Sequence, residues 1–176
     1  MIVIGYQGIG KSTLAKKDRK YLDLESSNFW VDGKRDENWY KVYCKQAINF
    51  SKQGYIVFTS SHQVVRDYFK EIKDKEIIII VYPSLELKDK WIGKLKDRYK
   101  ESQLDKDYKA WKNAEDRYEE NIKELFNDGF FIMPIKEIDY NLEDLIEGFI
   151  KLDIWNQLVR GTSTIIPTII GIELLS

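Results

Sequence analysis

Short apolar runs alternate with amphipathic stretches along this chain of 176 residues. The apolar runs predict five β-strands, at residues 1–4, 21–25, 55–61, 76–83 and 130–135. Helical spacing of apolar residues predicts helices at about 13–17, 36–54, 62–72 and across most of 84–128. A last helix is predicted from one apolar face made by Leu142, Leu145, Ile146, Phe149, Leu152 and Trp155. This alternation predicts an α/β fold in three layers (α/β/α), with a five-stranded, mainly parallel sheet.

The length of the chain suits one globular domain with a single core. We expect this domain to span residues 1–158, with the polar helical stretch at about 84–128 inserted as a lid. The tail at residues 159–176 differs from the rest because it is rich in β-branched residues and nearly uncharged. It is interpreted as an edge strand, as a contact with another chain, or as a segment foreign to the rest of the gene.

The segment between the first strand and the first helix carries the strongest chemical signal. Gly5-x-x-x-x-Gly10-Lys11-Ser12 fits the phosphate-binding P-loop pattern at every required position. The glycines let the backbone come close to an anion, and the exposed N–H groups form a nest for phosphate oxygens. We expect Lys11 to reach the β- and γ-phosphates of ATP and Ser12 to ligate Mg²⁺. The residues expected to bind the nucleotide are Gly8, Ile9, Gly10, Lys11, Ser12 and Thr13. The alternative is a glycine turn before an ordinary helix.

Charge and cysteine usage narrow the functional class. The formal net charge of −1 provides no basic field for nucleic acid or for a membrane surface. No run of 18 apolar residues exists for a membrane span, and a P-loop that starts at residue 5 predicts that no signal peptide precedes it. The single cysteine, Cys44, excludes an internal disulfide and is expected to be buried filler in a reducing cytosol.

Two carboxylates lie at the end of the second predicted strand. Asp23 and Glu25 come where parallel strands share a ligand-binding crevice, whereas the third and fourth strands end without an acid. We expect Asp23 to join Ser12 at the magnesium site, and Asp23 and Glu25 to grip or deprotonate an acceptor molecule. The alternative is that one of them caps a turn and the other is simply solvated.

Three arginines and the only histidine are candidates for contacts with phosphate or acceptor. Arginine offers a fixed bidentate fork to a phosphate, and Arg35 and Arg66 lie on the strand-end side of the predicted fold. Arg98 belongs to a basic helical strip beside an apolar one, as in a lid that closes over phosphates; the alternative is a solvated helix with ion pairs. His62 is expected to contact the acceptor, or else to start a helix without chemistry.

These features together resemble the small P-loop kinases, which phosphorylate nucleotides, nucleosides or small metabolites. The stretches GYQGIGKSTLAKK, YLDLESSNFW, QGYIVFTSSHQVVR and YPSLELKDKWIGKLKDRY also look like bacteriophage-encoded adenylate-kinase-like proteins. The resemblance covers roughly residues 1–158. It implies in-line transfer of the ATP γ-phosphate, with Lys11, Asp23 and Arg98 as catalytic residues, and a cytoplasmic location, with a phage-infected bacterium as one setting.

The acceptor is left open between two chemistries. A phosphate acceptor needs arginines, which Arg35, Arg66 and Arg98 supply, whereas a hydroxyl acceptor needs a carboxylate such as Asp23 or Glu25 to take its proton. We expect a nucleoside or deoxynucleoside monophosphate, with the hydroxyl of a nucleoside or small metabolite as the alternative. A P-loop nucleotide-binding module that acts in regulation is the third possibility. We expect a monomer or homodimer that binds neither nucleic acid nor membrane.

Overall fold

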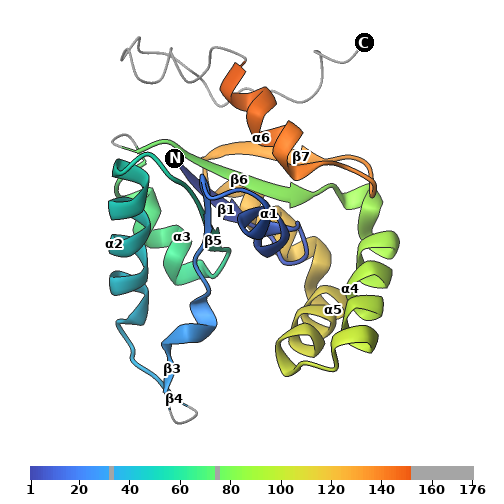
Figure 1. Ribbon diagram of the computed structural model, residues 1–176. Helices are drawn as coiled ribbons and strands as arrows, with labels where there is room; N and C mark the ends of the chain where they lie inside the picture. Colours follow the sequence, from blue (N-terminus) through green and yellow to red (C-terminus); the bar gives the residue numbers. More distant parts are fainter. Residues whose placement is uncertain (32–33, 74–75, 152–176) are drawn as a thin grey trace.

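The computed structural model describes residues 1–31, 34–73 and 76–151. Its core is a five-stranded parallel sheet in the order β2-β5-β1-β6-β7 (Figure 1). These strands are β1 (Ile2–Gly5), β2 (Tyr21–Asp23), β5 (Ile56–Ser60), β6 (Ile78–Pro83) and β7 (Phe131–Ile135). All five predicted strands are therefore confirmed, and the sheet is parallel throughout.

The central strands explain why the sequence signal was strong. Every residue of β1 and β6 is buried, because β1 pairs with β5 on one side and with β6 on the other while helices cover the faces. A strand buried on both faces reads as a continuous apolar run rather than as an alternation. The runs at residues 1–4 and 76–83 have this form.

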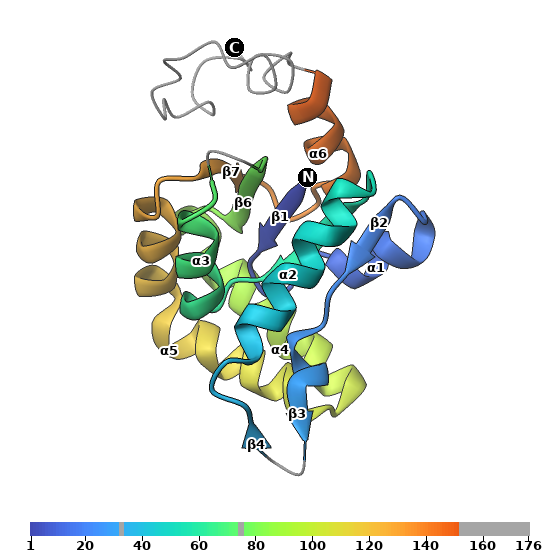
Figure 2. The ribbon, with the colours of Figure 1, turned by 90° about the vertical axis from the view of Figure 1, so that its left-hand side faces the viewer.

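Helices lie on both sides of the sheet, as Figure 2 shows in a view across the layers. On one side are α1 (Lys11–Lys17) and α6 (Leu142–Lys151), which contact each other; on the other are α2 (Trp39–Lys52) and α3 (Gln63–Lys70). The start of α2 differs slightly from the prediction. Asp36 lies before the helix, and its carboxylate accepts a hydrogen bond from the backbone of Asn38 (2.7 Å).

A small hairpin was missed by the sequence pattern. After a 3₁₀ turn at Ser26–Phe29, β3 (Trp30–Val31) and β4 (Lys34–Arg35) form a separate two-stranded antiparallel sheet. Strands of two residues are too short to show a periodicity. The hairpin nevertheless matters for the site, because it places Arg35 beside the ends of the main strands.

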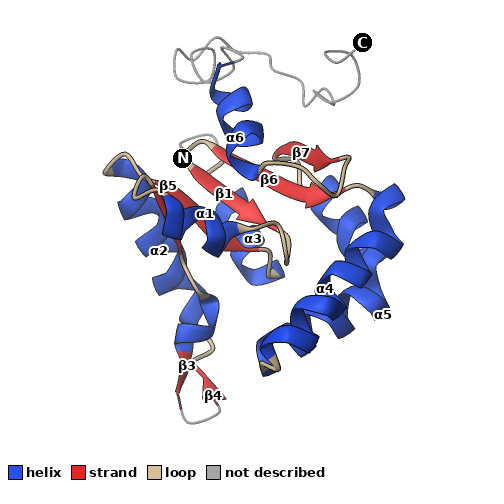
Figure 3. Cartoon of the chain, turned by 45° about the vertical axis from the view of Figure 1, so that its right-hand side comes forward, coloured by secondary structure: helices blue, strands red, loops and turns tan. Residues whose placement is uncertain are grey.

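The predicted insertion at 84–128 consists of two helices that pack side by side, α4 (Lys88–Ser102) and α5 (Asp105–Asn127), after a 3₁₀ turn at Leu85–Leu87 (Figure 3). Gln103 adopts a left-handed backbone conformation (φ 54°) in the turn between them. Three residues of the expected apolar strip, Leu87, Trp91 and Leu95, are buried, whereas the fourth, Tyr99, is half-buried and stacks on Trp111 of α5. We call α4 and α5 together the helical hairpin.

The last predicted helix is also present in its described part. Leu142, Ile146 and Phe149 of α6 are buried, and Leu145 packs against the core. Leu152, Trp155 and the tail at 159–176 lie outside the described residues. Cys44 is fully buried, as expected for filler. Among the described residues, no helix is both long and apolar enough to cross a membrane.

Candidate functional site

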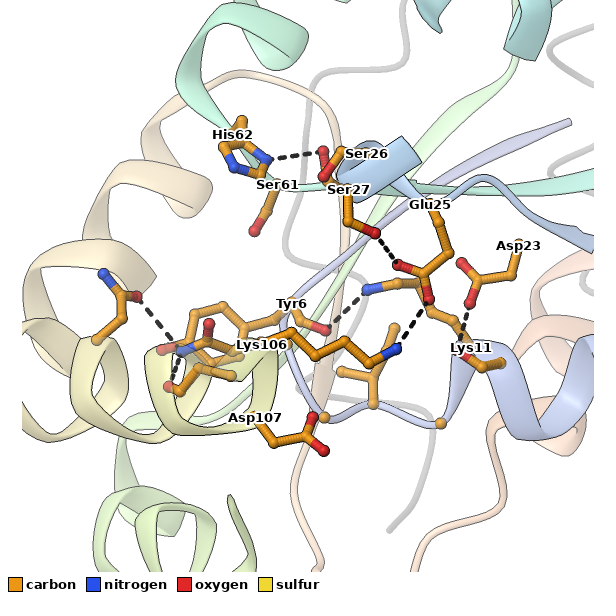
Figure 4. A pocket seen from close by; sticks show the side chains of 18 of the residues that line it. Tyr6, Lys11, Asp23, Glu25, Ser26, Ser27, Ser61, His62, Lys106 and Asp107 are labelled. Atoms are coloured by element: carbon orange, nitrogen blue, oxygen red, sulfur yellow. Dashed lines mark hydrogen bonds and ion pairs between the residues drawn. The ribbon is translucent and has the colours of Figure 1, made fainter. Parts of the chain in front are cut away.

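A pocket of about 1320 Å³ lies where the carboxyl ends of β1, β2 and β5 face the helical hairpin (Figure 4). Its wall combines segments far apart in the sequence, from the turn after β1 to the start of α6. All twelve residues predicted for the site line it: Gly8, Ile9, Gly10, Lys11, Ser12, Thr13, Asp23, Glu25, Arg35, His62, Arg66 and Arg98. The pocket is therefore the place where the chemistry expected from the sequence has to be tested.

The turn from β1 into α1 forms the floor of the pocket. Gly8 and Gly10 have φ values of +85° and +92°, a backbone conformation that favours glycine. At Gly5 a Cβ atom would come within 2.6 Å of the Ile9 side chain and 2.7 Å of the Lys11 side chain. Each of these three positions thus has a steric reason to be glycine. We call residues 5–13 the glycine loop.

Lys11 lies over the glycine loop, at the start of α1. Its ammonium nitrogen donates hydrogen bonds to the carbonyl oxygens of Gly5 (2.9 Å) and Tyr6 (3.3 Å). Burial lowers the pKa of Lys11, while the nearby carboxylates of Asp23 and Glu25 act in the opposite direction. A half-buried cation beside the backbone N–H groups of the loop makes this floor suited to an anion.

Ser12 and Asp23 meet beside Lys11. The Ser12 hydroxyl donates a hydrogen bond of 2.5 Å to Oδ2 of Asp23, so two oxygens from α1 and β2 converge on one point. Burial raises the pKa of Asp23, although the bond from Ser12 and the charge of Lys11 lower it. A hydroxyl and a carboxylate oxygen are donors that Mg²⁺ accepts.

The pair from Ser12 and Asp23 would not complete a magnesium site alone. Within the described ranges, no group of three or more His, Cys, Asp or Glu side chains could hold a metal ion. Mg²⁺ usually takes one or two protein oxygens and completes its shell with water and substrate phosphates. The donor set fits that mode of binding and does not fit a cage made by protein alone.

Glu25 bridges the pocket toward the helical hairpin. Its carboxylate accepts a hydrogen bond from the Ser27 hydroxyl (3.4 Å) and lies 3.7 Å from the ammonium nitrogen of Lys106 (Figure 4). Lys106 belongs to the first turn of α5, so this ion pair links the end of β2 to the tip of the hairpin. Glu25 is 40% exposed and remains accessible to a ligand.

His62 and Arg35 form a second wall around the ring of Trp39. Nδ1 of His62 lies 2.9 Å from the Ser60 hydroxyl, and its ring meets Trp39 edge-on (centroids 5.6 Å apart). The Arg35 guanidinium lies 4.1 Å from the centroid of the Trp39 ring and donates to the Ser26 carbonyl (2.8 Å). Burial, helped by the charge of Arg35, lowers the pKa of His62 and favours its neutral form.

Arg66 lines the pocket, but its guanidinium is already engaged. The group is paired with Asp128 through Nε, and it donates to the Ser61 carbonyl (2.6 Å) and to Glu124 (3.0 Å). Gln63 accepts a further bond from it. With its side chain 5% exposed, Arg66 holds the turn after β5 in place rather than pointing freely at the cavity. This differs from the open phosphate fork that the sequence suggested.

Arg98 approaches the pocket from the helical hairpin, also with an acidic partner. Its guanidinium lies 2.8 Å from a carboxylate oxygen of Asp107, a residue that is 6% exposed. One turn earlier, Lys94 lies over the rings of Trp91 (4.4 Å) and Tyr140 (5.0 Å). Lys94 and Arg98 of the basic strip expected on this helix line the pocket together with the glycine loop, whereas Lys90, the third residue of that strip, does not.

Several lining residues were not anticipated. The start of α5 contributes Lys106, Asp107 and Lys109, and the glycine loop itself contributes Gln7. Their sequence context is an ordinary run of charges on a helix, and only tertiary packing turns that run toward the cavity. Among the described lining residues nine are basic and five acidic, whereas the whole chain has a net charge of −1. The pocket therefore concentrates positive charge.

No protein-family model and no curated protein sequence matches this chain. The residues of the pocket are therefore the basis for a functional proposal.

Proposed function

We propose that this protein is an ATP-dependent phosphotransferase that transfers the γ-phosphate of ATP to a nucleoside or deoxynucleoside monophosphate. The observation that carries the proposal is the meeting of Ser12 and Asp23 beside Lys11, at the floor of a pocket rich in basic residues. The glycine-loop sequence carries the same residues in the P-loop order, and this pattern supports a triphosphate as the ligand in our proposal.

Each element of the floor has a role in this proposal. The backbone N–H groups of residues 8–13 surround the phosphates, and the Lys11 ammonium exchanges its carbonyl partners for phosphate oxygens. Ser12 and Asp23 hold the magnesium ion, directly or through its water shell. Mg²⁺ supplies neutralisation of the charge that the phosphate oxygens carry. Arg98 approaches from the opposite wall, where it meets the group being transferred.

The size and charge of the pocket support a second substrate. Sites for one small molecule are usually about 300–1,000 Å³, and this pocket of about 1320 Å³ is larger. We place the acceptor between Glu25, Arg35 and His62, with Arg66 shaping that wall through its bond to Ser61. During transfer, an acceptor oxygen bonds to the γ-phosphorus as the bond from that phosphorus to the β–γ bridging oxygen breaks.

One observation favours a second candidate, a kinase of a nucleoside or metabolite hydroxyl. Arg66 and Arg98 are both paired with buried aspartates, which leaves them less charge to offer an acceptor phosphate. Glu25, in contrast, is accessible and close to the floor, where it could take the proton of a hydroxyl. A phosphate acceptor is already ionised and needs no such base.

An acceptor panel tests both candidates. ADP release would be measured with Mg²⁺ and ATP in the presence of each nucleoside monophosphate, each deoxynucleoside monophosphate, each nucleoside, or no acceptor. We expect ADP release to depend on a monophosphate and to change little in Glu25→Gln. Turnover with nucleosides that collapses in Glu25→Gln would establish the hydroxyl candidate instead. Turnover that ignores every acceptor would contradict both kinases and favour a nucleotide-binding regulatory module.

A further inference from the structure

The glycine loop does not stand alone, because three consecutive residues of it contact the helical hairpin. Tyr6 packs edge-on against Tyr118 of α5, with ring centroids 6.0 Å apart. The side-chain amide of Gln7 donates to the Ala110 carbonyl of α5 (2.7 Å) and to the side chain of Asn113 (3.3 Å). The segment that would surround phosphates is thus attached to an element about 100 residues further along the chain.

The second helix of the hairpin holds the same segment through its backbone. Trp91 of α4 is fully buried, and its indole N–H donates a 3.0 Å hydrogen bond to the Gln7 carbonyl oxygen. Leu95, one turn later, packs against Gly8 so closely that a Cβ atom on Gly8 would lie 2.7 Å from it. Gln7 is therefore held through its side chain by α5 and through its main chain by α4.

The bond from Trp91 has a consequence for the phosphate site. The Gln7 carbonyl and the Gly8 N–H belong to one planar trans peptide unit, in which the two groups point in opposite directions. Fixing the carbonyl toward the indole therefore fixes the direction of the Gly8 N–H. Gly8 has a left-handed backbone (φ +85°), and because glycine moves easily between conformations, this peptide can rotate unless a contact holds it.

We propose that Trp91 and Gln7 are positioning residues, which hold the Gln7–Gly8 peptide so that the Gly8 N–H stays aimed at the phosphates of the bound nucleotide. This inference rests on the proposed function, because it needs a phosphate ligand on the glycine loop. It also assigns the hairpin a role besides that of a lid. The base of the hairpin is part of the phosphate site, and any movement of that base carries residues 6–8 with it.

The test uses Trp91→Phe, which removes the indole N–H and keeps an aromatic ring. The chain offers a matched control in Trp111→Phe, on the same hairpin, because the indole nitrogen of Trp111 is buried without a hydrogen-bond partner and does not line the pocket. Gln7→Ala is the second variant; it removes the side-chain anchor at a partly exposed position. Binding of MgATP and of magnesium tripolyphosphate would be measured by calorimetry, alongside the unfolding temperature.

The loss of one hydrogen bond of this kind changes the affinity for a ligand by about 3- to 10-fold. We expect Trp91→Phe and Gln7→Ala to weaken both ligands by such a factor, since both ligands share the phosphates, while Trp111→Phe binds as the unaltered protein does. Equal affinities in all folded variants would overturn the positioning role and leave the proposed function intact. If Trp91→Phe fails to fold, the result for Gln7→Ala decides. Absence of MgATP binding by the unaltered protein would overturn the proposed function, and the positioning role with it.

Discussion

The two sides of the pocket hold their charged groups in different ways. On the floor, Lys11 and Ser12 find their partners close by in the sequence, at Gly5 and Asp23, and all of these groups line or adjoin the cavity. On the wall formed by the turn after β5, the guanidinium of Arg66 is tied to Asp128, which is 62 residues away, and to Glu124. The floor consists of groups that a ligand can recruit by exchanging one or two bonds.

The wall after β5 is held by a cluster of ion pairs between Arg66, Lys70 and Asp128. Asp128 is 6% exposed, and it also pairs with Lys70 (2.5 Å), so one buried carboxylate joins two cations from α3 to the end of α5. Removing such a carboxylate leaves buried positive charge without compensation. A basic residue that lines a pocket therefore does not necessarily contact the ligand. Its existing partners decide whether it is available.

The largest expected effect is on the wall. We expect Asp128→Ala to lower the free energy of unfolding by about 3–5 kcal/mol, because the buried guanidinium of Arg66 then loses its paired carboxylate. Urea denaturation measures this loss. Asp67→Ala is the control, since Asp67 also pairs with Lys70 but is 53% exposed, and about 0–1 kcal/mol is expected there. Equal losses in the two variants would mean that the wall is not held by this cluster.

The next effect sharpens the role of the floor. We expect Asp23→Asn to raise the Mg²⁺ concentration needed for half-maximal ADP release by about 10- to 100-fold, as for groups that orient a metal's ligands. A magnesium titration at saturating ATP measures it. Asp18→Asn serves as the control, because Asp18 lies just after α1, does not line the pocket and has a carboxylate that pairs with Lys20. An unchanged magnesium requirement in Asp23→Asn would remove Asp23 from the metal site.

A smaller effect follows from protonation of the same residue. Burial raises the pKa of Asp23 above its ordinary value of 3.8, and a proton competes with Mg²⁺ for the carboxylate. MgATP affinity is therefore expected to rise with pH as Asp23 ionises. The stability of the ligand-free protein depends on pH in the opposite direction. Because the folded state favours the protonated form of Asp23, the contribution of that form to the free energy of unfolding is lost as pH rises through the raised pKa.

Calorimetric titrations at several pH values, between the ordinary pKa of a carboxylate and neutrality, measure this dependence. Asp23→Asn should lack the part of it that belongs to the carboxylate. If that variant keeps the full pH dependence of the unaltered protein, another group is responsible.

The smallest effect concerns the ion pair that links the end of β2 to the helical hairpin. Glu25 and Lys106 are 3.7 Å apart and 40% and 58% exposed, so solvent screens their attraction. We expect Lys106→Ala to change the free energy of unfolding by less than about 1 kcal/mol and the acceptor KM by about fivefold or less. Steady-state kinetics at low and high salt measure the second quantity. A rise in the acceptor KM of about 10-fold or more, as large as the change expected for Asp23→Asn, would mean that Lys106 contacts the acceptor directly.

The sequence predicted the parts of this molecule that local pattern determines. The apolar runs located all five strands of the main sheet, and the contiguous glycine loop located the floor of the pocket. The hairpin of β3 and β4 was missed because two-residue strands carry no period. The acidic partners of Arg66, and the partners of Gln7 on α4 and α5, lie 58 to 106 positions away in the sequence, and no local pattern reveals them.

The most direct test of the account is calorimetric titration of the purified protein and of Lys11→Met with ATP in the presence of magnesium. Lys16→Met is the matched control, since Lys16 lies on the same helix, is exposed and does not line the pocket. The account predicts saturable 1:1 binding for the unaltered protein and for Lys16→Met, and an affinity about 10- to 100-fold lower for Lys11→Met, as when a hydrogen bond to a charged group is removed. Heat that is indistinguishable from dilution, or equal affinity in all three proteins, would contradict it.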